Sequence, residues 1–176
     1  MTRRGLREWN IIKSYISLTQ GNVVEIGAHK GDTTLLIATE FPKKVIYAID
    51  YTGGITMPKD QAHEKPLIIA EKARHKTNVL TVDHNSRTYD FNNLPFITTF
   101  FIDGDHSYDG VKSDTENAIR YLEKHQGGHV LMHDYRIDDK YPWMGVRKYV
   151  DNELCRFKVE KPSRTVLAIF EVKAKR

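Results

Sequence analysis

The stretch that most constrains the fold reads F-F-I-D-G-D-H-S-Y-D-G and runs from Phe100 to Gly110. Its apolar beginning stops directly before Asp103, Asp105 and His106, as a buried parallel strand does where it ends in a functional crevice. The next segment, 109–126, has apolar residues at helical spacing and is closed by two glycines, which predicts a crossover helix. A strand that passes through a polar turn into a helix is the repeating unit of an open α/β sheet.

The polar residues of this stretch have two interpretations. Ligands of open α/β sheets bind outside the carboxyl ends of the strands, so Asp103, Asp105 and His106 lie where chemistry is expected. In the alternative they form only a polar loop, in which Ser107 or Asp109 caps the following helix. We favour the functional interpretation for the two acids Asp103 and Asp105 because they directly follow a buried strand.

Length and composition predict a single domain. A chain of 176 residues can bury a full core, and it contains no repeat or Pro/Gly/Ser-rich linker at which a second domain could begin. We expect one domain over residues 1–176, with an N-terminal cap helix in 1–20 and the catalytic core in 21–176. The single cysteine, Cys155, and apolar runs no longer than strands predict a cytoplasmic protein with no membrane partner.

The net charge of +4 and the pI of about 9.0 permit anionic partners without requiring them. Lysine and arginine are spread along the chain, whereas a nucleic-acid reader typically has a basic stripe interleaved with aromatic residues. The nearest approach to such a stripe is residues 136–148, and it is sparse. A nucleic-acid partner is therefore disfavoured but stays open, as does a homo-oligomer.

The pattern of apolar runs predicts a three-layer, Rossmann-like α/β fold with a seven-stranded, mostly parallel sheet. Besides the crossover helix, helices are expected in 6–18, 32–40, 59–76 and 141–153. The helix in 6–18 is expected only to pack against the core, and the strongly charged 59–76 is expected to be covered by solvent. The last two strands are separated by four residues, which predicts an antiparallel C-terminal hairpin. The seven predicted strands are Asn22–Ile26, Val45–Ile49, Asn78–Val82, Phe100–Ile102, His129–Met132, Arg156–Glu160 and Thr165–Val172.

A glycine turn follows the first strand with the spacing E-x-G-x-x-x-G, formed by Glu25, Gly27 and Gly31. Glycine lets a backbone approach a ligand closely, and the helix that follows offers free N–H groups. The spacing differs from the G-x-G-x-x-G of dinucleotide sites. An acid inside the strand and one close glycine instead suit a ligand with a cationic end, and Ala28 lies in the same turn.

Acids also end the second and third strands. Asp50 lies about 20 residues beyond the glycine turn, where an acid accepts hydrogen bonds from ribose hydroxyls. Tyr51 follows it and begins a loop long enough to form a wall of the site. At the end of the third strand, Asp83 and His84 are candidates to contact an adenine edge, and a plain polar turn is the equal alternative.

Taken together, F-I-D-G-D-H-S-Y-D-G-V-K-S-D, G-G-H-V-L-M-H-D-Y and G-V-R-K-Y-V-D resemble class I S-adenosylmethionine-dependent methyltransferases. More narrowly, they resemble the small O-methyltransferase branch that includes the macrocin O-methyltransferase group. The resemblance covers roughly residues 22–170. It implies that S-adenosylmethionine binds along the glycine turn and strand ends, through Glu25, Gly27, Ala28, Gly31, Asp50, Tyr51, Asp83, His84 and Asp103.

The resemblance also implies a divalent cation on Asp103 and Asp134, with Mg²⁺ the first choice and Mn²⁺ the second. The chain departs from the family pattern at His133, which stands where an acid or asparagine often flanks the second metal carboxylate. If His133 binds as well, a softer ion such as Mn²⁺ or Fe²⁺ is favoured. Neighbouring residues of one strand point to opposite faces, which argues against His133 unless the strand has already ended.

The function implied is methyl transfer from S-adenosylmethionine to a hydroxyl oxygen of a small molecule, with help from the cation. The acceptor has to lose its proton or bind the cation, and Asp105 and His106 are the candidate bases. Two alternatives stay open: a methyltransferase fold that uses its cofactor or metal for a different reaction, and an RNA methyltransferase.

Overall fold

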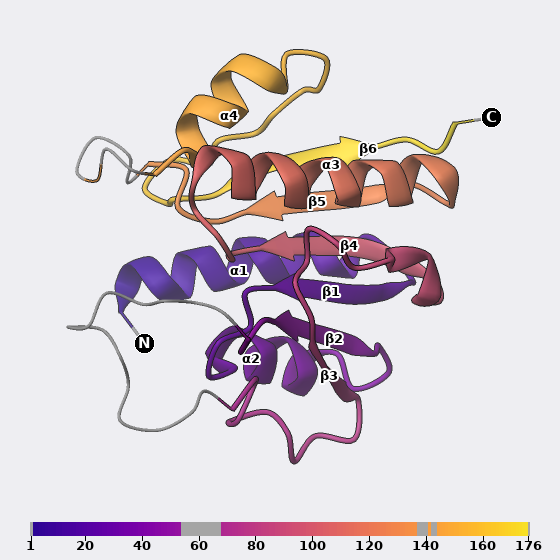
Figure 1. Cartoon of the computed structure of the whole chain (residues 1–176). Helices are drawn as coiled ribbons and strands as arrows, with labels where there is room; N and C mark the ends of the chain where they lie inside the picture. Colours follow the sequence, from indigo (N-terminus) through magenta and orange to yellow (C-terminus); the bar gives the residue numbers. More distant parts are fainter. Residues whose placement is uncertain (1, 54–67, 137–140, 142–143, 176) are drawn as a thin grey trace.

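Six strands form one sheet in the order β3-β2-β1-β4-β5-β6 in the computed structural model, which describes residues 2–53, 68–136, 141 and 144–175 (Figure 1). All neighbours are parallel except β5 and β6, which are antiparallel. The order reverses between β1 and β4, and this switch point is where open α/β sheets bind ligands. The strands are β1 (Asn22–Ile26), β2 (Ile46–Asp50), β3 (Val79–Asp83), β4 (Ile97–Ile102), β5 (Gly128–Met132) and β6 (Ala168–Val172).

Helices cover both faces of the sheet, which confirms the predicted three layers (Figure 1). Apolar residues of α1 (Arg3–Ser17) and α2 (Asp32–Glu40) pack on one face together with Val23 of β1. The neighbouring residue Val24 points to the other face, where it joins α3 (Tyr108–Lys124), α4 (Val146–Glu153) and the 3₁₀ turn Phe91–Asn93. This alternation is the ordinary consequence of strand geometry.

The prediction of seven strands is wrong in one element. The segment 156–160 forms no strand and touches the sheet edge through a single bridge, in which Glu160 and Ile169 exchange two backbone hydrogen bonds of 2.7 and 2.9 Å. The chain leaves α4 through a tight turn closed by the Phe157 amide, which donates to the Leu154 carbonyl at 2.9 Å. Phe157 then packs on Phe170 of β6, so the segment reaches the edge of β6 only at Glu160.

Two predicted helices also differ from the structure. Helix α4 begins at Val146 rather than Tyr141, and the preceding Gly145 amide donates to the His106 carbonyl at 2.7 Å. In the predicted helix 59–76, residues 59–67 lie outside the described residues, and 68–76 form turns. Ala70 has φ +50°, a left-handed conformation that a helix does not accommodate.

The segment 68–76 is also not the solvent-covered element that its charges predicted. Ile69, Ala70 and Ala73 are buried, and the Ala70 amide donates to the His29 carbonyl of the glycine turn at 2.7 Å. The segment therefore braces the loop that follows β1. Among the residues that the structure describes, no helix is both long and apolar enough to cross a membrane.

Candidate active site

Glu25, inside β1, is the buried acid of the site. It is 2% exposed, and its carboxyl accepts a hydrogen bond of 2.5 Å from the Thr34 hydroxyl of α2. Burial raises the pKa of Glu25 to about 8 against the opposing effect of Thr34, and the charges of Asp103 and Asp50 raise it further. A cationic group placed beside Glu25 would favour its charged form, so the residue suits the ligand class that the sequence predicted.

The glycine turn adopts backbone conformations that favour glycine. Gly27 and Gly31 have φ values of +87° and +84°, in the region that residues with a side chain rarely adopt. A Cβ at Gly31 would lie 2.7 Å from the Cα of Ala70, so the packing of segment 68–76 against this turn also requires glycine at position 31. Ala28 is buried in the turn, where its amide donates to the Ile49 carbonyl at 3.2 Å.

Asp50 joins the end of β2 to the glycine turn. One carboxylate oxygen accepts from the His29 amide at 2.6 Å, and the other accepts from the Tyr51 amide at 2.8 Å. These two bonds fix the direction of the carboxylate and leave each oxygen a further lone pair for a ligand. Tyr51 itself is 40% exposed.

The residues predicted for the adenine lie at the end of β3, beside β2. The Asp83 carboxylate accepts from both the amide and the hydroxyl of Thr52, and these hydrogen bonds lower its pKa. His84 places its ring edge-to-face against Tyr89, with 5.3 Å between the centroids. Both residues lie on the rim that continues from Asp50 across the carboxyl ends of the strands.

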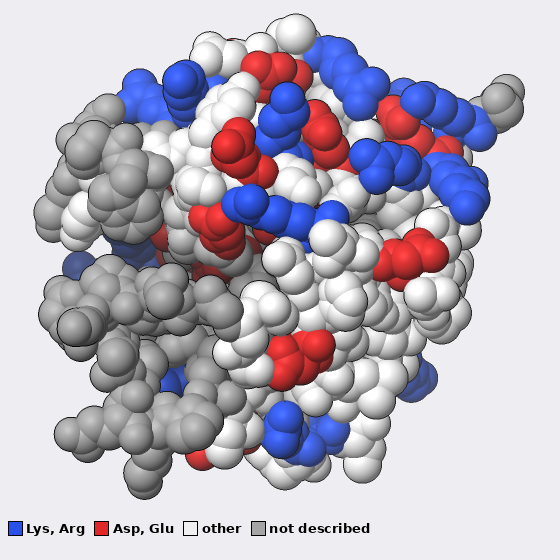
Figure 2. Space-filling model, in the orientation of Figure 1, with Lys and Arg blue, Asp and Glu red and all other residues white. Residues whose placement is uncertain are grey.

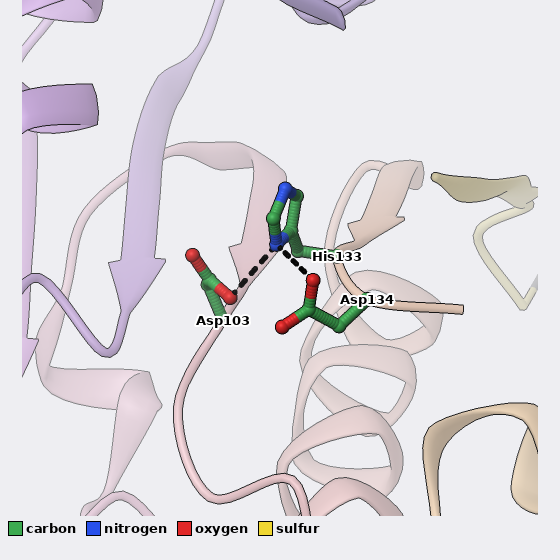
Figure 3. A group of neighbouring side chains, drawn as sticks. All are labelled: Asp103, His133 and Asp134. Carbon is green, nitrogen blue, oxygen red and sulfur yellow. Dashed lines mark ion pairs between the residues drawn. The ribbon is translucent and has the colours of Figure 1, made fainter. Parts of the chain in front are cut away.

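Asp103, His133 and Asp134 converge at the ends of β4 and β5 (Figure 3). The Nδ1 atom of His133 lies 3.1 Å from an Asp103 oxygen and 3.0 Å from an Asp134 oxygen. β5 ends at Met132, and Asp134 has φ +59°, so the alternation of a strand no longer applies to these two residues. This removes the geometric argument against His133.

The chemistry of this cluster fits a divalent cation. One ligand atom from each of the three residues lies within 4.8 Å of the others. The His133 Nδ1 is buried and has no hydrogen-bond partner, although two carboxylates are near it. A nitrogen that faces two carboxylates off the hydrogen-bonding direction suits three ligands directed at a common ion.

His106 is brought to the same cluster. Its Nε2 lies 3.0 Å from an Asp134 oxygen and 3.3 Å from an Asp103 oxygen. Burial alone would lower the pKa values of both histidines, but the two carboxylates outweigh it and raise the pKa of His106 to about 9 and that of His133 to about 10. The same contacts overcome burial to lower the pKa of Asp103 and of Asp134.

Asp105, the other candidate base, is directed away from this cluster. Its carboxylate pairs with the Arg87 guanidinium and accepts from the Ser107 amide at 2.9 Å. Burial acts to raise the pKa of Asp105, but the Ser107 hydrogen bonds and the Arg87 charge lower it overall. Ser107 also caps α3 by accepting from the Gly110 amide at 3.1 Å, as the structural interpretation of this loop predicted.

Two acids near the site were missed in the sequence. Asp114 of α3 is 1% exposed and accepts a hydrogen bond of 2.6 Å from the Ser86 hydroxyl, which ties α3 to the loop after β3. Its signal was an acid at a core-facing position of the helix, between Val111 and Ala118. Glu8 of α1 lies 4.0 Å from the Nε2 of His133, and nothing in its local sequence distinguishes it from a surface residue.

Comparison with known proteins identifies the family. A family model described as a methyltransferase domain matches residues 24–135, more than half of the chain, and this range includes every strand end described above except that of β6. The chain belongs to this methyltransferase family. Its strand order and antiparallel last strand confirm the predicted class I methyltransferase fold. No curated protein sequence matches the methyltransferase.

Solved structures share the fold. CalS11, a calicheamicin methyltransferase, has a TM-score of 0.66 at 15% identity, over 96% of this chain and 80% of that chain. MycE of the mycinamycin pathway, solved with Mg, SAH and mycinamycin VI, has a TM-score of 0.55 at 15% identity. The match covers 89% of this chain and 46% of the MycE chain. An rRNA methylase from Streptococcus thermophilus has a TM-score of 0.57 at 13% identity, over 100% of this chain and 99% of that chain. At these identities the likeness establishes the fold, and the methyltransferase spans less than half of MycE.

Proposed function

We propose that the methyltransferase transfers a methyl group from S-adenosylmethionine to a hydroxyl oxygen of a small molecule, with a divalent cation on Asp103, His133 and Asp134. One observation carries the proposal: the buried Nδ1 of His133, without a hydrogen-bond partner, lies within 3.1 Å of both carboxylates. Mg²⁺ and Mn²⁺ are the candidate ions, because both accept carboxylate and solvent oxygens and leave positions for a substrate.

The cofactor would lie along the strand ends beside this cluster. Glu25 would pair with the cationic methionine part, and the glycine turn would let the backbone approach it. Asp50 would accept hydrogen bonds from the ribose, and Asp83 and His84 would lie near the adenine. Because a Cβ at Gly27 would lie 2.3 Å from the Asp103 carbonyl, the turn and the cation cluster are in direct contact.

The reaction is an in-line displacement at the methyl carbon. The acceptor oxygen forms a bond to the methyl carbon, the carbon–sulfur bond breaks, and S-adenosylhomocysteine leaves. The enzyme contributes mainly by holding the oxygen and the methyl group in line. The cation would bind the acceptor oxygen and lower the pKa of its hydroxyl group.

His106 is the better placed of the two candidate bases. Its Nε2 lies at the cluster, whereas Asp105 is occupied by Arg87 and Ser107. The acceptor proton would pass to Nε2 in its neutral form. The charges of Asp103 and Asp134 raise the pKa of His106, so offsetting these charges would return the imidazole to the range of a base at neutral pH.

A small-molecule acceptor fits the surface charge better than RNA does. On the face shown in Figure 2, lysine and arginine side chains alternate with acidic ones instead of forming a continuous basic stripe. RNA binding relies on phosphate contacts, for which such a stripe is the usual signature. The fold shared with an rRNA methylase keeps RNA as an alternative to be tested.

The test is methyl transfer from S-adenosylmethionine labelled in its methyl group to a panel of hydroxylated small molecules. We expect transfer to stop in excess chelator and to return when Mg²⁺ or Mn²⁺ is added back. Asp134→Asn should reduce transfer at least about tenfold with little change in cofactor affinity. Asp109→Asn, at an acid in the first turn of α3, is the matched control. Undiminished transfer in excess chelator would exclude a role for the cation.

A further inference from the structure

Glu8 of α1 reaches the cation cluster from the opposite side of His133. Its side chain is only 12% exposed. One oxygen accepts from the Val166 amide at 3.0 Å and from the Arg4 guanidinium at 3.1 Å. The other oxygen lies 4.0 Å from the Nε2 of His133. The N-terminal helix, expected from its sequence only to pack against the core, thus places an acid behind a predicted ligand.

The two nitrogens of His133 therefore face different surroundings. Nδ1 faces the carboxylates of Asp103 and Asp134, as Figure 3 shows, and Nε2 faces Glu8. The ring is also held against Phe101, with 6.1 Å between the ring centroids. With a cation between Nδ1 and the two carboxylates, an acid near Nε2 favours the proton on that nitrogen and leaves the lone pair of Nδ1 to the ion.

We propose that Glu8 is a positioning residue that makes His133 a nitrogen ligand, and that the site consequently prefers a transition-metal ion such as Mn²⁺ to Mg²⁺. The inference rests on the proposed function, because it concerns the same cation. Mg²⁺ takes oxygen ligands almost exclusively, whereas imidazole nitrogen suits first-row transition metals. Two carboxylates with one oriented imidazole form a mixed oxygen and nitrogen set, which Mg²⁺ uses poorly.

The substitution Glu8→Gln tests this role with little change in shape. The glutamine carbonyl can keep the hydrogen bond from the Val166 amide, so α1 stays docked. Its NH₂ group then faces the Nε2 of His133 as a donor, which favours the proton on Nδ1. A protonated Nδ1 cannot bind a metal ion. Loss of an outer-shell partner of this kind typically lowers metal affinity about 10–100-fold.

The experiment is a titration of the purified protein with Mn²⁺, followed by the EPR signal of free Mn²⁺, with Mg²⁺ as competitor. We expect the wild type to bind Mn²⁺ more tightly than Mg²⁺ and Glu8→Gln to bind Mn²⁺ at least about tenfold more weakly. Glu40→Gln is the matched control, since it removes an acid of α2 that pairs with Lys13 of α1 at 2.5 Å, and it should bind Mn²⁺ as the wild type does.

A second variant, His133→Asp, keeps the test decisive should Glu8→Gln fail to fold. It gives the site three carboxylates, and the preference for Mn²⁺ over Mg²⁺ should shrink. Equal Mn²⁺ affinity of the wild type and Glu8→Gln, or an unchanged ion preference in His133→Asp, would overturn the role of Glu8 and His133 while leaving the cation in place. A wild type that binds neither ion would instead overturn the cation itself, and with it the proposed function.

Discussion

The carbonyl oxygen of Asp103 occupies the space that a side chain on Gly27 would need, because a Cβ at Gly27 would lie 2.3 Å from that oxygen. The turn after β1 and the acid after β4 are thus in backbone contact at the switch point of the sheet. This contact joins the two halves of the proposed site, since Gly27 belongs to the cofactor turn and Asp103 to the cation cluster.

Gly27→Ala should weaken S-adenosylhomocysteine binding strongly. Its φ of +87° is unfavourable for alanine, at a cost of about 1–3 kcal/mol in folding free energy, and the new methyl group would displace Asp103. Calorimetric titration of the cofactor product and thermal unfolding measure the two effects. Gly104→Ala is the control, because its nearest contact is a side-chain methyl of Ile26 at 3.2 Å and its φ is not in the left-handed region. Equal behaviour of the two variants would disprove the role of the contact.

Asp50→Ala should weaken S-adenosylhomocysteine binding by about tenfold or more, the usual effect of losing hydrogen bonds to a charged group. The loss of the two amide bonds from His29 and Tyr51 should cost only modest stability, because Asp50 is partly exposed. Asp109→Ala, which also removes an exposed acid, should bind the ligand normally. Unchanged affinity in Asp50→Ala would refute the ribose contact.

Glu25→Gln should separate stability from binding. The pKa of Glu25 is about 8 in the folded chain against an ordinary value of 4.5, so the folded state keeps a proton that the unfolded state releases between these pH values. The wild type therefore loses stability as pH rises from 4.5 through 8, and the permanently neutral glutamine does not. We expect Glu25→Gln to be more stable than the wild type at pH 8 and equal to it near pH 4.5, and to bind the cofactor more weakly at pH 8, where the carboxyl group can ionise. Denaturant unfolding at the two pH values, with cofactor titrations alongside, checks this.

Asp114→Asn should also raise stability, in a lower pH window. Burial raises the pKa of Asp114 to about 6 from 3.8, although Ser86 and Arg87 oppose the shift and Asp105 adds to it. The wild type thus loses stability between pH 3.8 and 6, by at most about 3 kcal/mol for a shift of this size. Asparagine can still accept from Ser86, so the variant should gain stability at pH 7 and none at pH 3.5. A variant that is less stable than the wild type at pH 7 would mean that the charge of Asp114 contributes to folding.

The sequence predicted those parts of the fold and the site whose signal lies in neighbouring residues of the chain. Glu25 lies within an apolar run and Asp50 and Asp103 stand directly after one, and the sheet brings the three to one edge as expected. The seventh strand failed because Arg156–Glu160 has the right alternation, while the turn that closes α4 keeps it from the edge. His133 was doubtful only because a sequence does not mark the residue at which β5 ends.

Residues brought in from distant elements left no such signal. Glu8 reaches His133 from a helix more than a hundred positions away, and its spacing on α1 is that of any partly buried acid. Ala70 braces the glycine turn through one left-handed residue inside a segment whose charges predicted a solvent-covered helix. Asp105 looked like a base because it follows Asp103 so closely, but Arg87, which is distant in sequence, and the Ser107 amide hold its carboxylate away from the cluster.

The most direct test of the account is an anomalous difference map, recorded near the manganese absorption edge, from crystals soaked with S-adenosylhomocysteine and Mn²⁺. We predict one peak shared by Asp103, His133 and Asp134, with the ligand beside it: its amino group near Glu25 and its ribose on Asp50. A ligand bound in that position with no peak at the three residues would contradict the cation-assisted mechanism. A nucleoside bound anywhere else would contradict the site itself.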